Sequence, residues 1–151
     1  MEQRRKPHLR VAVTPECNFN CVYCRAGGEG LPPNGVLMSS GEIIEVVRVA
    51  SEVGFKHLKI TGGEPTLRKD LFEIISGCSG LESLDEVQLV TNGSALTREY
   101  TQKLADSGLD NITISLDAAS RERFRDVTER DKFEKVISGM GWYQGGRSRN
   151  T

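Results

Sequence analysis

The chain contains no apolar run near the roughly 20 residues that span a bilayer, so no transmembrane segment is expected. Its 20 lysines and arginines are balanced by 21 aspartates and glutamates, and a net charge of −1 gives no compositional argument for nucleic-acid binding. No apolar stretch follows the charged residues 1–6, so no secretory signal is visible. The length of 151 residues suits one domain. These features predict a cytoplasmic enzyme or binding domain whose partners include neither a membrane nor a nucleic acid.

Histidine and cysteine are scarce, and the cysteines are unevenly placed. The two histidines have no paired ligand spacing, and three of the four cysteines fall between Cys17 and Cys24. Crowded thiols in a reducing compartment indicate metal binding or catalysis before disulfides. Cys78 lies far away in the sequence, and we expect it to be a buried core residue.

Strand-like and helix-like hydrophobic patterns alternate along the chain. We expect strands at 9–13, 57–60, 86–90 and 111–116, and helices at 39–54, 69–76, 97–108, 121–127 and 132–140. Such strand–helix units predict a parallel sheet with right-handed crossovers, which a doubly wound sheet and a (β/α) barrel share.

One face of several expected strands is polar or small, and this favours the barrel. Arg10 and Ala12 alternate with apolar residues, as do Lys59 and Thr61. A parallel strand covered by helices on both faces normally has a continuous apolar run. The expected fold is therefore α/β: a partial TIM-like (β/α) barrel of about four units, whose polar face lines a lumen.

The three clustered cysteines, Cys17, Cys21 and Cys24, follow the first expected strand, at the edge where α/β enzymes place their active sites. Three soft thiolates on one loop can each bind one iron of a [4Fe–4S] cluster and leave the fourth iron open. The alternative is a structural zinc site. It needs a fourth ligand, and neither Cys78 nor a histidine lies at a standard spacing.

A second loop, Thr61-Gly62-Gly63-Glu64-Pro65, directly follows the second expected strand. Paired glycines allow close approach of the backbone to a ligand, and Glu64 can accept hydrogen bonds from an ammonium group. A tight turn with a surface glutamate would give the same pattern. We favour the interpretation as a ligand-binding loop because both loops fall on one rim of the expected barrel.

The two loops together resemble the radical S-adenosylmethionine (SAM) superfamily. Within it, the chain resembles the GTP 3′,8-cyclases of molybdenum cofactor biosynthesis, which are lyases. The resemblance is carried by LRVAVTPECNFNCVYC at 9–24, LKITGGEPTLRKDL at 58–71, TNG at 91–93 and GLDNITISLD at 108–117.

The resemblance implies a role for eleven residues. Cys17, Cys21 and Cys24 would hold a [4Fe–4S] cluster that an external electron donor reduces. SAM would bind the open iron and contact Tyr23, Gly62, Gly63, Glu64 and Ser115. Glu64 would lie opposite the methionyl ammonium. GTP would contact Arg10, Lys59 and Thr91.

Several departures from the cyclase pattern leave other functions open. Pro15-Glu16 stands where the cyclases have Asp-Arg, and Lys59 stands where arginine is usual. A peptide or another small molecule as substrate is one alternative, and an inactive fragment that binds the cluster and SAM is another.

The chain also lacks the three further cysteines that the cyclases carry near their C-terminus. We interpret residues 1–140 as the N-terminal part of a radical SAM core and 141–151 as a polar tail, truncated or disordered. Four strands cannot close a barrel, so we expect self-association through the open edge of the fourth strand.

Overall fold

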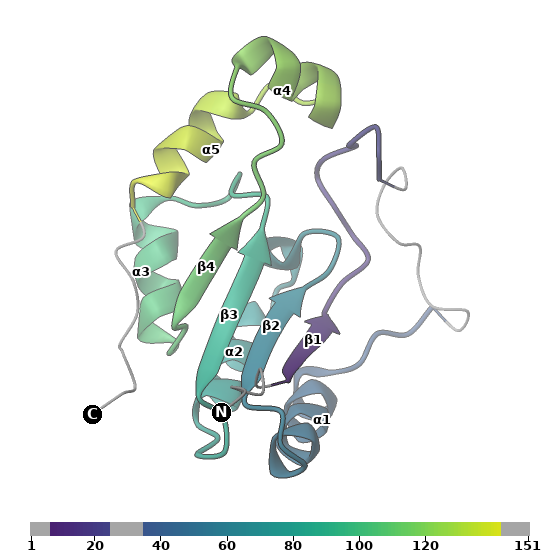
Figure 1. The fold of residues 1–151 in the computed structure, drawn as a ribbon, viewed down its shortest axis with the longest axis vertical. Coiled ribbons are helices and arrows are strands. Elements are labelled where there is room, and N and C mark those ends of the chain that lie inside the picture. Colours follow the sequence, from purple (N-terminus) through teal and green to yellow (C-terminus); the bar gives the residue numbers. More distant parts are fainter. Residues whose placement is uncertain (1–6, 25–34, 143–151) are drawn as a thin grey trace, which may run out of the picture.

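The computed structural model describes residues 7–24 and 35–142, so most of the expected polar tail and the start of the chain lie outside the described residues. Its elements alternate as the sequence predicts (Figure 1). They are β1 (His8–Ala12), α1 (Ser40–Glu52), β2 (His57–Thr61), the short 3-10 helix η1 (Pro65–Leu67), α2 (Leu71–Ser79), β3 (Glu86–Thr91), α3 (Arg98–Asp106), β4 (Asn111–Ile114), α4 (Arg121–Thr128) and α5 (Phe133–Met140). None of the described helices is long and apolar enough to cross a membrane.

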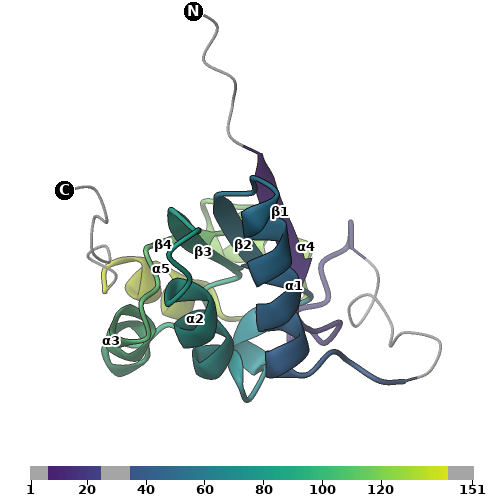
Figure 2. The ribbon, with the colours of Figure 1, turned by 90° about the horizontal axis from the view of Figure 1, so that it is seen from below.

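The four strands form one parallel sheet in the order β1-β2-β3-β4. A doubly wound sheet reverses its strand order at a switch point, whereas a barrel adds each strand beside the previous one. The consecutive strand order therefore indicates that the sheet is a segment of a barrel and not a doubly wound sheet. Figure 2 shows α1, α2 and α3 on one side of the sheet, as expected for the outer layer of such a segment.

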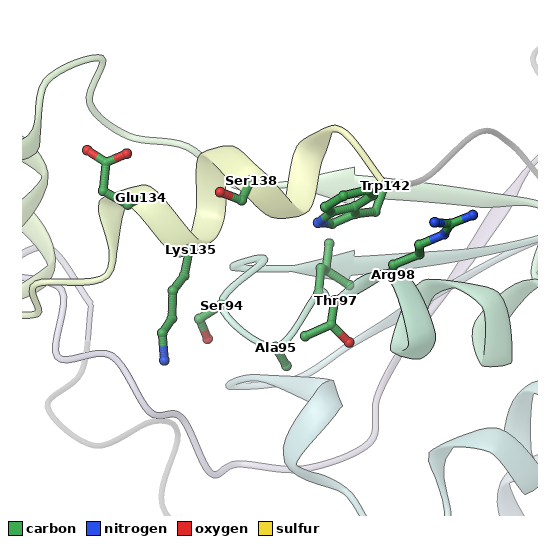
Figure 3. A pocket seen from close by; sticks show the side chains of 9 residues that line it. Ser94, Ala95, Thr97, Arg98, Glu134, Lys135, Ser138 and Trp142 are labelled. Atoms are coloured by element: carbon green, nitrogen blue, oxygen red, sulfur yellow. The ribbon is translucent and has the colours of Figure 1, made fainter.

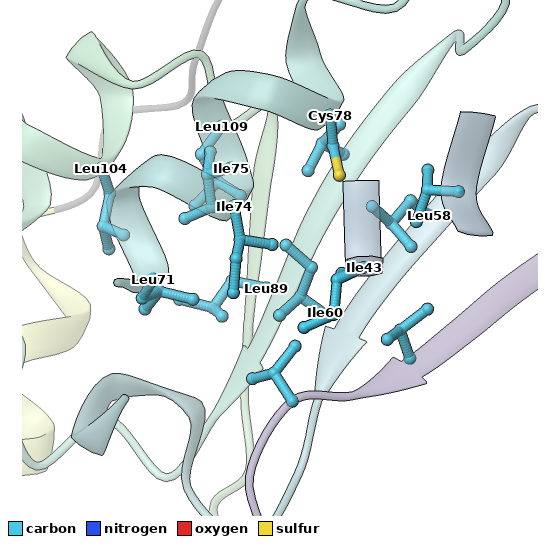
Figure 4. Packing of buried hydrophobic residues seen from close by; sticks show 14 of the residues in the cluster. Ile43, Leu58, Ile60, Leu71, Ile74, Ile75, Cys78, Leu89, Leu104 and Leu109 are labelled. Carbon is cyan, nitrogen blue, oxygen red and sulfur yellow. The ribbon is translucent and has the colours of Figure 1, made fainter. Parts of the chain in front are cut away.

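Alternate strand residues build the core between the sheet and these helices. Leu58, Ile60, Val87 and Leu89 are at most 1% exposed and pack with apolar residues of α1 and α2 (Figure 4). Full burial of such a side chain contributes about 1.5–3 kcal/mol. Cys78 lies in the same core at 0% exposure, which confirms its expected structural place, and burial raises the pKa of its thiol to about 11.

The opposite face of the sheet is polar. Arg10 and Thr113 are exposed, and Lys59 and Thr61 are half-buried. Arg10 and Lys59 are direct partners in the β1–β2 register, so two cations lie side by side on this face. This arrangement confirms the alternation that favoured a barrel.

Local signals place the first helix correctly and the second only in part. At α1 the Ser39 side chain accepts from the Glu42 amide, and the Glu42 carboxylate accepts from the Ser39 amide, so the capping box is complete. The helix expected at 69–76 instead spans Leu71–Ser79. It begins later because the preceding residues form η1, which Glu64 caps.

Arg68 ties the exit of β1 to the segment before α1. Its guanidinium donates to the carbonyls of Val13 (2.6 Å) and Met38 (2.7 Å) and forms two bonds with the Asp70 carboxylate (2.6 and 3.0 Å). The side chain is only 10% exposed. The Arg68 guanidinium also holds the pKa of Asp70 below its ordinary value.

We expect Arg68→Leu to lower the free energy of unfolding by about 2–4 kcal/mol, because two carbonyls and a carboxylate lose their donor. The urea midpoint measures this change. The control is Arg48→Leu on the exposed face of α1, where the pairs with Glu45 and Glu52 are open to water and contribute little to stability. Equal, small losses for both variants would contradict the account.

Candidate active site

Four loops meet at the carboxyl edge of the sheet, and three of them carry residues that the sequence singled out. The cysteine loop follows β1, the Gly-Gly-Glu-Pro loop follows β2, Asn92 follows β3, and Ser115 follows β4. Figure 1 shows α4 and α5 beyond the ends of the strands, with the segment after β1 rising toward α4. The fold therefore gathers most of the expected site at one edge.

The first two loops are joined through their backbones. The amide of Gly63 donates to the Thr14 carbonyl at 2.7 Å, and the amide of Glu64 donates to the Glu16 carbonyl at 2.6 Å. A Cβ on Gly62 would lie 2.5 Å from the Thr14 carbonyl oxygen, and one on Gly63 would lie under 3.0 Å from the Glu16 carbonyl oxygen. Both glycines are thus needed for the close approach of the two loops.

Glu64 is fully buried at this junction. Its Oε1 accepts from the Thr66 amide (3.1 Å), the Thr66 hydroxyl (2.6 Å) and the Thr91 hydroxyl (2.6 Å), and its Oε2 accepts from the Asn92 amide (2.7 Å). Within the described chain, no ion pair involves this carboxylate. Neutral donors alone therefore hold a buried acidic group, and Oε2 keeps capacity for one more donor. Burial, followed by the charge of Glu64, raises the pKa of Tyr100 to about 12.

The three cysteines lie on the loop after β1 and are free thiols. Cys17 and Cys21 are half-buried, and Cys24 is exposed. The Phe19 amide donates to Cys17 Sγ at 3.4 Å, so the loop already directs a backbone donor at one sulfur. Partial burial raises the pKa of Cys21, the neighbouring Tyr23 hydroxyl opposes that rise, and the charges of Asp117, Cys17 and Cys24 add to it.

An aromatic cluster fixes the cysteine loop against α4 and α5. Phe19 is 5% exposed and packs edge-on against Phe124, which in turn packs against Phe133. Cys17 and Cys21 border this cluster. Loop amides of Asn20 and Val22 also donate to carbonyls at the end of α4, at 3.1 and 2.9 Å. The loop is therefore anchored through both apolar packing and backbone bonds.

Tyr23 and Ser115, both expected to contact SAM, lie on neighbouring parts of the edge. The Tyr23 hydroxyl donates to the Asp117 carboxylate at 2.6 Å, which joins the cysteine loop to the segment after β4. Ser115 is exposed, and its amide donates to the Thr91 carbonyl at 2.9 Å. The strand expected to reach residue 116 ends at Ile114, and Ser115 makes this one further bond.

The three residues assigned to GTP are placed differently from one another. Arg10 and Lys59 lie on the open polar face, and no ion pair or side-chain hydrogen bond within the described chain involves either. Thr91 is 2% exposed, and its hydroxyl donates to Glu64 and accepts from the Gly93 amide. Thr91 therefore supports the Glu64 carboxylate, and its expected contact with GTP stays a prediction.

A pocket of about 530 Å³ lies between α5 and the loop that precedes α3 (Figure 3). None of the eleven expected site residues lines it. Its lining residues are Ser94, Ala95, Leu96, Thr97, Arg98, Glu134, Lys135, Ser138 and Trp142.

The thiol loop fits an iron–sulfur cluster in its donor set. Three free cysteines on one anchored loop supply soft ligands, one sulfur already accepts a backbone N–H, and no disulfide competes for them. Among residues 7–24 and 35–142, no three His, Cys, Asp or Glu side chains converge closely enough for a single metal ion. Three cysteines leave a tetrahedral zinc site one ligand short, whereas a [4Fe–4S] cluster can keep one iron without a protein ligand.

Comparison with known proteins decides the family. The sequence family that matches the chain is the radical SAM superfamily, over residues 11–145. The chain belongs to this superfamily. Radical SAM enzymes use a [4Fe–4S] cluster together with SAM.

Curated relatives of this radical SAM chain share about 40% of its residues. Molybdenum cofactor biosynthesis protein moc-5 of Caenorhabditis elegans is 40% identical over 146 residues, which are 96% of this chain and 24% of that protein. A probable GTP 3′,8-cyclase of Archaeoglobus fulgidus is 41% identical over 133 residues, which are 88% of this chain and 43% of that protein. The chain thus spans less than half the length of either relative.

Solved structures agree on the fold. Streptococcus suis SuiB bound to S-adenosylmethionine superimposes with a TM-score of 0.70 at 18% identity, covering 87% of this chain and 30% of that one. Native anSMEcpe with bound AdoMet gives a TM-score of 0.70 at 21% identity, covering 91% of this chain and 40% of that one. At these identities the likeness concerns the barrel segment alone.

Several residues that build the site were not predicted. Phe19 anchors the cysteine loop, and Thr66 and Asn92 hold the Glu64 carboxylate. The only available signal for Phe19 was an apolar residue in a polar loop. Asn92 belongs to the TNG motif at 91–93, in which the resemblance implied a role for Thr91 alone.

Proposed function

We propose that this chain is the part of a GTP 3′,8-cyclase that binds the cluster and SAM and contributes the first contacts to GTP. Similarity to a probable cyclase over most of the chain supports the assignment. The observation that carries the choice of substrate is the pair Arg10 and Lys59. Two adjacent cations on an open polar face, with no counter-ion in the described chain, favour a multiply charged anion such as a triphosphate.

When bound, a reduced cluster together with SAM would supply radical chemistry to the substrate. The chain's own residues position the reactants. Cys17, Cys21 and Cys24 hold the cluster, and the buried Glu64 carboxylate accepts from the methionyl ammonium. Tyr23, Gly62, Gly63 and Ser115 complete the SAM contacts by resemblance.

The proposal includes an external electron donor and a cytoplasmic, reducing setting that keeps the thiols free. It also includes an association at the outer edge of β4. Because β4 is the last strand of the described sheet, its free backbone groups can pair with a further strand, from a second copy or from additional chain.

Binding of GTP to the reconstituted chain tests the substrate. We expect Arg10→Gln and Lys59→Gln each to raise the Kd for GTP roughly tenfold to a hundredfold, because each removes a charge-assisted bond. The control is Lys103→Gln on α3, whose cation pairs with Glu99, and it should leave the Kd unchanged.

Two outcomes would separate the alternatives. SAM binding without GTP binding would assign the radical chemistry to another small molecule or a peptide. Binding of both without turnover would mean that catalysis needs the additional length that the relatives possess.

A further inference from the structure

Asn92, the residue after β3, contacts both halves of the proposed site. Its amide donates to Glu64 Oε2 at 2.7 Å. Its side-chain Nδ2 donates to Asn18 Oδ1 at 2.8 Å. Asn18 directly follows the first cluster cysteine, whereas Glu64 belongs to the loop after β2, so one residue of a third β/α unit joins the two loops.

Further hydrogen bonds hold the side chains of Asn92 and Asn18 in place. The Asn92 Oδ1 accepts from the Ser94 amide at 3.0 Å, and Asn18 Nδ2 donates to the Ser94 hydroxyl at 3.0 Å. Arg130 donates to the Asn18 carbonyl at 3.1 Å. Asn18 and Asn92 are both half-buried, so these bonds are partly shielded from competing water.

The turn after β3 does not need the bond between Asn92 and Asn18. The bond from Ser94 to Asn92 Oδ1 is an ordinary Asx turn, and it would hold the chain after β3 by itself. The bond from Asn92 to Asn18 spans 74 positions and adds nothing to that turn. It bears only on where the cysteine loop sits relative to Glu64.

We propose that Asn92 is a positioning residue that sets the cluster loop at the correct place relative to Glu64. This inference rests on the proposed function, because a bound SAM must reach the open iron and the Glu64 carboxylate at once. The backbone bonds between the first two loops hold the cysteine loop near Glu64 from β1 and β2. Asn92 adds a contact from the end of β3, so residues from three strands set the position of the cysteine loop relative to Glu64.

The test uses the full chain, reconstituted anaerobically, with Asn18→Ala, Asn92→Ala and the double variant. We expect each single variant to raise the SAM concentration for a half-maximal change of the cluster EPR spectrum about fivefold, because each removes the bond between Asn92 and Asn18 and one hydrogen bond is worth about that factor. The double variant should lose less than the product of the two, because both changes remove the same bond. Iron content should match that of the parent.

The matched control is Asn111→Ala, which removes an asparagine bonded to Glu86 at the opposite end of the sheet. In cofactor-free protein, amide exchange over residues 14–22 should accelerate in Asn92→Ala and stay unchanged in Asn111→Ala. If Asn92→Ala does not fold, Asn18→Ala carries the test, because it leaves the turn at 92–94 intact.

The outcomes separate this inference from the function beneath it. A parent protein whose cluster does not respond to SAM overturns the proposed function and the inference together. A responsive parent with single variants that match it, or with independent effects that multiply, overturns the positioning role alone.

Discussion

Replacing Cys17, Cys21 or Cys24 by serine is expected to reduce the iron retained after reconstitution from about four atoms per chain to a small fraction. Each cysteine is the sole protein ligand of one iron in this account, so no neighbour can take its place. The hydroxyl is a harder and less acidic donor than the thiol and holds iron poorly. Iron analysis and absorption spectra of the three variants measure the loss.

Cys78→Ala is the control for these variants. Cys78 is fully buried in the core and lies on α2, and the cluster should form without it. We expect it to cost about 1 kcal/mol of stability through lost packing and to leave the iron content unchanged. Loss of bound metal in Cys78→Ala would instead favour a site with four cysteine ligands, such as zinc.

Gly63→Ala should have the second largest effect. The new methyl group would lie under 3.0 Å from the carbonyl oxygens of Pro15 and Glu16, and both obstacles are backbone. The two loops must separate, which breaks the bonds from the Gly63 and Glu64 amides. We expect about 1–3 kcal/mol lower stability and at least a tenfold weaker response of the cluster to SAM. Urea unfolding and EPR titration measure the two effects.

Gly41→Ala provides a matched comparison. Gly41 lies in the first turn of α1, and a Cβ there meets nothing within 4 Å. Alanine favours a helix over glycine, so stability should stay equal or rise slightly. If Gly63→Ala behaved like Gly41→Ala, the close contact between the two loops would not matter for function.

The fold was largely predictable because its signals are local. Ser39 and Glu42 form a capping box within one turn, and the alternation of polar Lys59 with buried Leu58 and Ile60 marks which face meets the helices. The late start of α2 was missed because η1 depends on a cap by Glu64, a side chain whose orientation no hydrophobic pattern encodes.

The sequence predicts which residues form the site, but it predicts their geometry only in part. The loops and the family resemblance located the cysteines and Glu64. The burial of Thr91 and the contact between Asn18 and Asn92 depend on how separate β/α units stack. The anchoring role of Phe19 likewise depends on its packing against residues of α4 and α5. Long-range packing of this kind leaves no period in a single sequence.

The most direct test of the account is the EPR spectrum of the anaerobically reconstituted, reduced chain with and without SAM. The account predicts a [4Fe–4S] signal that shifts when SAM is added, because SAM binds the iron that lacks a cysteine. A chain that retains no cluster, or a cluster whose spectrum is indifferent to SAM, would contradict the central claim that these described loops form an open-iron site.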